Sequence, residues 1–110
     1  MAAVTVIVDA ENVRRSRWPN LSKDELLAAC RAWAAAEGRE LVVVFDHSAP
    51  EDAPDVVAAP SADDWIASHA AAHAPFWLVT SDRELRTRVD GAERVVGGGG
   101  FLELLELSAR

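Results

Sequence analysis

Short apolar runs alternate with amphipathic stretches along the chain, and this alternation predicts its secondary structure. Runs rich in β-branched and aromatic residues predict buried strands at Val4–Val8, Leu41–Phe45, Val56–Ala58, Phe76–Val79 and Arg94–Val96. Stretches with a helical period predict helices over about 23–37, 62–72, 82–89 and 101–107. With a short helical turn or loop after the first strand, the predicted order is β-α-β-β-α-β-α-β-α.

The predicted strands are apolar on both faces, which is typical of parallel sheets that helices cover on each side. This pattern predicts an α/β fold, a three-layer α/β/α sandwich around a mostly parallel five-stranded sheet. A chain of 110 residues fits one domain, 1–110, and the sequence shows no internal repeat and no linker.

Capping signals mark where the predicted helices begin. Ser22, Ser61 and Ser81 each precede a helix and are followed by an acid three residues later, as in a capping box. Because these serines would cap their helices, the nearby carboxylates of Asp63 and Asp82 are predicted to be free for another role.

Composition limits the class of protein. Half of the residues are hydrophobic, so a core can form without disulfides or structural zinc, and the single cysteine, Cys30, is expected to be buried in a helix. The apolar runs are too short to span a bilayer and no basic stretch precedes the first strand, so we expect a cytoplasmic protein without a membrane partner. The sequence leaves the oligomeric state open.

The chain has a net charge of −7, which opposes tight non-specific binding of nucleic acid. Much of its positive charge lies in two arginine groups, one after the first strand and one after the fourth: Arg14, Arg15 and Arg17, and Arg83, Arg86 and Arg88. Guanidinium groups bind phosphate through paired donors, although solvated helix faces would show the same pattern. Bound cations would cancel local negative charge, so a metal-bridged phosphate remains compatible with the overall sign.

Aspartates stand where predicted strands end or helices begin: Asp9, Asp46, Asp63 and Asp82. The carboxyl ends of parallel strands share one edge of a sheet, so these side chains can meet there. Carboxylates gathered in one crevice repel each other unless a cation joins them, and oxygen-rich clusters suit Mg²⁺ or Mn²⁺. We therefore predict a metal-dependent phosphoryl-transfer site, while each aspartate taken alone fits a structural role at a helix start.

Other polar and glycine-rich segments carry weaker signals. Asn12 follows Asp9 by three residues, so on a helical turn it would share a face with that carboxylate and orient it or a water; the alternative is a loop asparagine that bonds its own backbone. His69 and His73 have zinc-ligand spacing but lack the glutamate of HExxH, which favours surface histidines. Gly97–Gly100 lacks the lysine of a P-loop and is predicted to be a flexible turn.

The chain resembles the NYN domain of the PIN-like nuclease superfamily, most closely its YacP-like branch, through these segments in order: VIVDAENVRRS, WPNL, VVVFD, SADDWI and VTSDRELRTRV. That branch has Asp-Gly-x-Asn after the first strand, Phe-Asp after the second, Thr-Ala-Asp before a helix and Thr-Ser-Asp after the fourth strand. The resemblance covers nearly the whole chain.

The resemblance implies a PIN-like sandwich and a Mg²⁺- or Mn²⁺-dependent endoribonuclease. By motif, the catalytic set would be Asp9, Asp46, Asp63, Asp82 and Asn12, in which Asp9, Asp63 and Asp82 bind the metal and Asp46 lies at the rim. The implied partner is RNA, single-stranded or messenger, and the ribosome is a possible setting because the YacP-like branch includes an endonuclease that acts on mRNA there.

Further residues are expected to contact the substrate. Ser81 would be a supporting polar group by motif, and Arg14, Arg15 and Arg83 would hold flanking phosphates. Departures from the branch pattern occur beside the first acid, where Ala10 and Glu11 replace the usual glycine and aromatic residue.

Three alternatives stay open. In the first, the domain keeps the fold as a catalytically inactive RNA- or protein-binding module, and in the second it is a toxin-type PIN ribonuclease with an antitoxin partner. A haloacid dehalogenase-type phosphatase fits less well, because Glu11 stands where that class has its general-acid aspartate.

Overall fold

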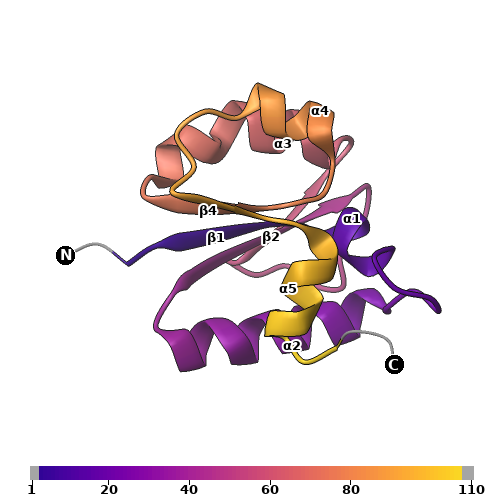
Figure 1. The fold of residues 1–110 in the computed structure, drawn as a ribbon. Helices are drawn as coiled ribbons and strands as arrows, with labels where there is room; N and C mark the ends of the chain where they lie inside the picture. Colours follow the sequence, from indigo (N-terminus) through magenta and orange to yellow (C-terminus); the bar gives the residue numbers. More distant parts are fainter. Residues whose placement is uncertain (1–2, 108–110) are drawn as a thin grey trace.

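The computed structural model describes residues 3–107 and shows a five-stranded sheet with helices on both faces (Figure 1). The elements follow the chain in this order: β1 Thr5–Asp9, α1 Ala10–Arg14, α2 Lys23–Glu37, β2 Glu40–Asp46, β3 Val56–Ala59, α3 Ala62–His69, the 3₁₀ helix η1 Ala70–His73, β4 Phe76–Val79, α4 Arg83–Arg88, β5 Arg94–Val96 and α5 Gly98–Leu104. The predicted α/β/α fold is confirmed, and every predicted strand is present.

The strand order is β3-β2-β1-β4-β5, and all neighbouring strands in it run parallel. The chain builds the sheet outward from β1 to β3, then returns to place β4 on the other side of β1. In the shared register, Val8 lies beside both Val43 and Val79. Connections leave β1 and β4 in opposite directions, so a crevice opens where their carboxyl ends meet.

Alternate residues of β1 face opposite helical layers. Val6 and Val8 pack on the side of α1, α2 and α5, where Cys30 and Phe101 are fully buried. Ile7 points to the other side and packs against α3 and α4. Figure 1 shows α2 and α5 below the sheet and α3 and α4 above it. Cys30 is therefore a core residue, as predicted.

Helix α2 has the capping predicted from the sequence. The Ser22 hydroxyl accepts a hydrogen bond of 3.1 Å from the Glu25 amide at the start of the helix. Gly38 ends it with a left-handed φ of 65°, a conformation that costs glycine little. No helix in residues 3–107 is long and apolar enough to cross a bilayer.

The glycine run corrects one prediction. Gly97–Gly100 is not a flexible turn: Gly97 caps α5, and Gly98 begins it. A Cβ atom on Gly98 would lie 2.1 Å from the Ser16 hydroxyl oxygen, so the missing side chain lets α5 approach the end of α1 closely. The helix predicted over 62–72 also ends early as an α-helix, at His69, and continues as η1.

Candidate functional site

A small cleft of about 160 Å³ opens at the carboxyl edge of the sheet beside β1. All four predicted aspartates line it, Asp9, Asp46, Asp63 and Asp82, together with Glu11, Asn12 and Arg15. We refer to this space as the acidic cleft. Side chains from distant parts of the chain meet there because β1, β2 and β4 are neighbours in the sheet and end at the same edge.

Asp9 is the most enclosed of these acids, with 4% of its surface exposed. Its Oδ2 accepts a hydrogen bond of 2.8 Å from the Thr80 hydroxyl. The pKa of Asp9 is raised from its ordinary 3.8 to about 6, chiefly because the carboxyl is buried. The charges of Asp63, Asp46 and Asp82 act in the same direction, and the hydrogen bond from Thr80 opposes them. The site therefore holds Asp9 in a position where its negative charge is unfavourable.

Asp82 caps helix α4, which corrects the prediction that Ser81 would do so. Asp82 Oδ1 accepts hydrogen bonds from the amides of Glu84 and Leu85, at 2.9 and 3.2 Å. Aspartate is as good an N-cap as serine. The prediction that Asp82 has no capping role is therefore wrong. Only its Oδ1 takes part in capping, and within residues 3–107 its Oδ2 accepts no hydrogen bond.

Ser81 is turned away from α4 because two other elements hold it. Its amide donates a hydrogen bond of 2.8 Å to Asn12 Oδ1, and its hydroxyl accepts one of 2.8 Å from the Gly98 amide. Asn12 therefore bonds a distant backbone rather than its own. Through these hydrogen bonds the two polar residues join α1, the β4–α4 turn and α5.

Asp46 and Asp63 meet at the start of α3. Asp46 Oδ1 accepts a hydrogen bond of 2.8 Å from the Ala62 amide, which ties the end of β2 to this helix. Ser61 caps α3 through the Asp64 amide, so Asp63 has no capping role, as predicted. Burial and the neighbouring charges of Asp82 and Asp46 raise the pKa of Asp63 above its ordinary value, with Arg88 opposing them.

Two residues of the site were missed by sequence reasoning. Thr80 is fully buried, and its hydroxyl donates to Asp9 while accepting a hydrogen bond of 3.1 Å from the Asp82 amide. Its position directly after β4 and two residues before Asp82 was the feature of the sequence that could have indicated it. Glu11, 8% exposed, lines the acidic cleft and forms an ion pair with Arg14; the sequence marked it as a departure from the motif.

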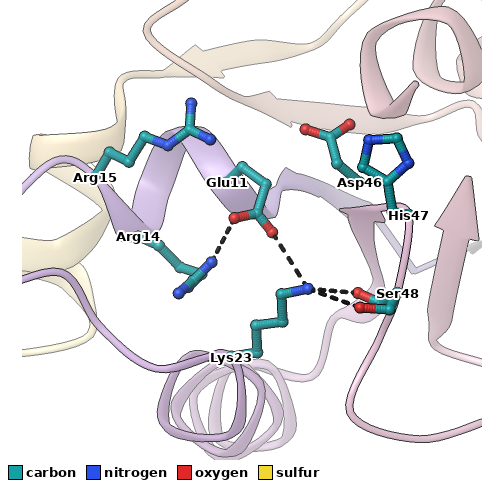
Figure 2. Close-up of a pocket in the computed structure, with 7 residues that line it drawn as sticks. All are labelled: Glu11, Arg14, Arg15, Lys23, Asp46, His47 and Ser48. Atoms are coloured by element: carbon teal, nitrogen blue, oxygen red, sulfur yellow. Dashed lines mark hydrogen bonds and ion pairs between the residues drawn. The ribbon is translucent and has the colours of Figure 1, made fainter. Parts of the chain in front are cut away.

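The predicted phosphate-binding arginines do not all come together. A second cleft, of about 430 Å³, adjoins the first; we call it the cationic cleft, and it is lined by Glu11, Arg14, Arg15, Lys23, Asp46, His47 and Ser48 (Figure 2). Arg15 lines both clefts. Arg83 is exposed at the start of α4 and lines neither.

The chemistry of the acidic cleft suits a hard divalent cation, although its side chains are not arranged around one. Within residues 3–107, no group of three His, Cys, Asp or Glu side chains stands ready to hold a metal ion. Each aspartate nevertheless keeps at least one carboxylate oxygen that accepts no hydrogen bond from the described residues. Oxygen donors of this kind are the ligands that Mg²⁺ and Mn²⁺ prefer.

The fold is an α/β/α sandwich around a parallel five-stranded sheet, and acids from its strand ends and helix starts line one cleft. Among solved structures, the crystal structure of Rae1 (YacP) from Bacillus subtilis is similar, with a TM-score of 0.76 and 23% sequence identity over 94% of this chain and 75% of that chain. No family model matches the sequence, and no curated protein matches it. The similarity confirms the YacP-like fold that the motifs predicted.

Proposed function

We propose that the protein is a metal-dependent endoribonuclease that hydrolyses phosphodiester bonds of single-stranded RNA. The proposal depends on one observation: carboxylates from four separate segments line a single cleft, and the most buried of them, Asp9, has its pKa raised to about 6. Burial and, to a smaller extent, the neighbouring carboxylates disfavour the charge of Asp9, and a bound divalent cation would offset both effects. Perturbed acids in a cleft are typical of catalytic sites.

In this proposal Asp9, Asp63 and Asp82 hold Mg²⁺ or Mn²⁺. The bound ion would supply a Lewis acid for the phosphate and lower the pKa of an attacking water. Thr80 fixes Asp9, and the capping bonds fix one oxygen of Asp82. The acids within residues 3–107 are not already grouped around one ion position, so a side chain has to move to complete the set of ligands. Asp63 can do so, because it accepts no hydrogen bond within the same residues.

The remaining residues of the proposed site hold its elements together or bind the substrate. Asp46 stays at the rim, held by the Ala62 amide, and the Asn12–Ser81 hydrogen bond keeps the first and fourth strand ends together. Arg15 lies at the junction of the two clefts, where its guanidinium can bind a phosphate through paired donors.

Cleavage of single-stranded RNA in the presence of Mn²⁺ or Mg²⁺ tests the proposal. Activity should be lost with a chelator and in Asp9→Asn and Asp82→Asn, by about a hundredfold or more, because charge stabilisation at the reacting phosphate is a large catalytic effect. Asp24→Asn is the matched control, since Asp24 is an exposed acid on the first turn of α2. Full activity in both site variants contradicts the assignment.

A catalytically inactive RNA-binding module is the second candidate, favoured by the absence within residues 3–107 of acids already grouped around an ion position. RNA binding that survives substitution of every cleft aspartate by asparagine, with no cleavage in either metal, would establish it. From the resemblance to the YacP-like branch we also propose mRNA on the ribosome as the setting. Co-sedimentation of the protein with ribosomes tests this.

A further inference from the structure

We propose that the cationic cleft is a subsite for the phosphate next to the scissile one, with Arg15 and Lys23 as its donors and Glu11 setting its charge. The inference rests on the endoribonuclease function proposed above. It assigns a role to a cleft larger than the acidic one, to Lys23, which lies outside the motifs, and to Glu11, which the motifs mark only as a departure.

The two clefts are adjacent and share part of their lining. Glu11, Arg15 and Asp46 line both of them. Figure 2 shows Arg14 and Lys23 directed at the Glu11 carboxylate, with Asp46 and His47 on the far side of the cleft. An RNA strand with one phosphate at the acidic cleft therefore has a cation-lined path for the next phosphate.

Arg15 is the arginine with donors to spare. Its side chain is exposed, and within residues 3–107 it donates no hydrogen bond. Arg14 differs, because its Nε donates to the Leu21 carbonyl oxygen at 2.7 Å and its Nη1 pairs with Glu11. A guanidinium without an internal partner can present its paired donors to a phosphate at no cost in broken bonds.

Lys23 places a second positive charge inside the cleft. It is the first residue of α2, and its Nζ donates to the Ser48 carbonyl oxygen at 2.7 Å and to the Ser48 hydroxyl at 3.1 Å. The same nitrogen lies 4.0 Å from Glu11 Oε2. These contacts hold the ammonium group between α2 and the loop after β2, so its charge is positioned before any ligand arrives.

Glu11 lowers the positive charge of this cleft from within. Its Oε1 pairs with Arg14, while Oε2 is buried and accepts no hydrogen bond from the described residues. A glutamine at this position keeps the shape and an oxygen for Arg14 but removes the negative charge. Glu11→Gln should therefore strengthen phosphate binding, whereas loss of either Lys23 or Arg15 should weaken it.

The test is fluorescence anisotropy of a short, end-labelled single-stranded RNA in EDTA, where no metal ion bridges the strand to the acidic cleft. Lys23→Met and Arg15→Gln should weaken binding by roughly threefold to tenfold, and Glu11→Gln should strengthen it by a similar factor, because each changes one nearby charge. The salt dependence of log K should fall by about 0.7 in Lys23→Met, as expected for one lost contact to a single strand.

Arg94→Met is the matched control, since Arg94 begins β5 at the opposite edge of the sheet. Equal weakening in Arg94→Met and Lys23→Met, weaker binding in Glu11→Gln, or no binding by the unaltered protein would overturn the subsite. Arg15→Gln breaks no internal hydrogen bond of the described residues, so it tests the cleft even if Lys23→Met fails to fold.

Cleavage measured in parallel with Mn²⁺ separates this inference from the proposed function. Cleavage without the expected binding pattern overturns the subsite and leaves the endoribonuclease intact. The expected binding pattern without cleavage overturns the endoribonuclease and supports the cationic cleft as a phosphate site of an RNA-binding module.

Discussion

Thr80 and Asp9, 71 positions apart in the chain, are joined by a hydrogen bond of 2.8 Å from the threonine hydroxyl to the carboxylate. The same hydroxyl accepts a hydrogen bond from the Asp82 amide. One buried side chain thereby fixes the acid at the end of β1 and the backbone of the acid that follows β4. The geometry of the acidic cleft depends on this contact as much as on the carboxylates themselves.

Thr80→Val should raise the pKa of Asp9 further above about 6, because the Thr80 hydrogen bond lowers the pKa and valine cannot donate one. Titration of the Asp9 carboxyl carbon by NMR in the metal-free protein measures the shift. Thr87→Val is the control, since the Thr87 hydroxyl bonds the Glu84 carbonyl oxygen on exposed helix α4. An unchanged Asp9 pKa would show that the hydrogen bond has no electrostatic effect.

Asp9→Asn should stabilise the metal-free protein above pH 6. The folded pKa of about 6 exceeds the ordinary 3.8, so the folded state binds the proton more tightly, and stability falls as pH rises from about 4 to about 6. At about 1.36 kcal/mol per pKa unit, the loss is roughly 3 kcal/mol. Urea unfolding at pH 4 and pH 8 checks this: the variant's advantage should appear at the higher pH and vanish at the lower.

Millimolar Mn²⁺ should raise the melting temperature of the unaltered protein, because the ion binds the folded acids and relieves their repulsion. Linkage gives about 2.7 kcal/mol of stabilisation when the free ion is at a hundred times its Kd. The shift should be much smaller in Asp63→Asn and unchanged in Asp24→Asn. The melting temperatures are measured by calorimetry with and without Mn²⁺. Equal shifts in all three proteins would place the ion outside the acidic cleft.

Asp82→Asn and Asp82→Ala should separate capping from catalysis. Asparagine still caps α4 through its side-chain oxygen, so the Asn variant should keep its stability and lose RNA cleavage. Alanine cannot cap, so the Ala variant should lose cleavage and about 1 kcal/mol of unfolding free energy as well. Cleavage retained by Asp82→Asn would mean that the charge of Asp82 is dispensable.

The fold was predictable because its signals are local. Apolar runs such as Phe76–Val79 show where strands lie, and their apolar faces on both sides indicate a sheet covered by two helical layers. The sharing of one cleft by Asp9 and Asp82 also follows from parallel topology, since the ends of neighbouring strands meet at one edge.

Contacts between distant elements were not predictable from local patterns. Ser81 has the sequence of an N-cap, yet its hydroxyl accepts a hydrogen bond from Gly98 and its amide donates to Asn12, so Asp82 takes the capping position. The glycines at 97–100 form the start of a helix because α5 packs closely on the end of α1. Helix propensities of single residues hold no information about such a tertiary contact. The cationic cleft forms where α2 meets the loop after β2, at the hydrogen bond from Lys23 to Ser48. These residues are 25 positions apart, so no local pattern brings them together.

The Asn12–Ser81 hydrogen bond connects residues separated by 69 positions and joins segments on either side of the β1–β4 boundary. A protein cut between η1 and β4 would therefore yield two fragments, each with only part of the acid set. Co-expression of the two fragments, one fused to each of a pair of interacting partners, would make RNA cleavage a reporter of their association.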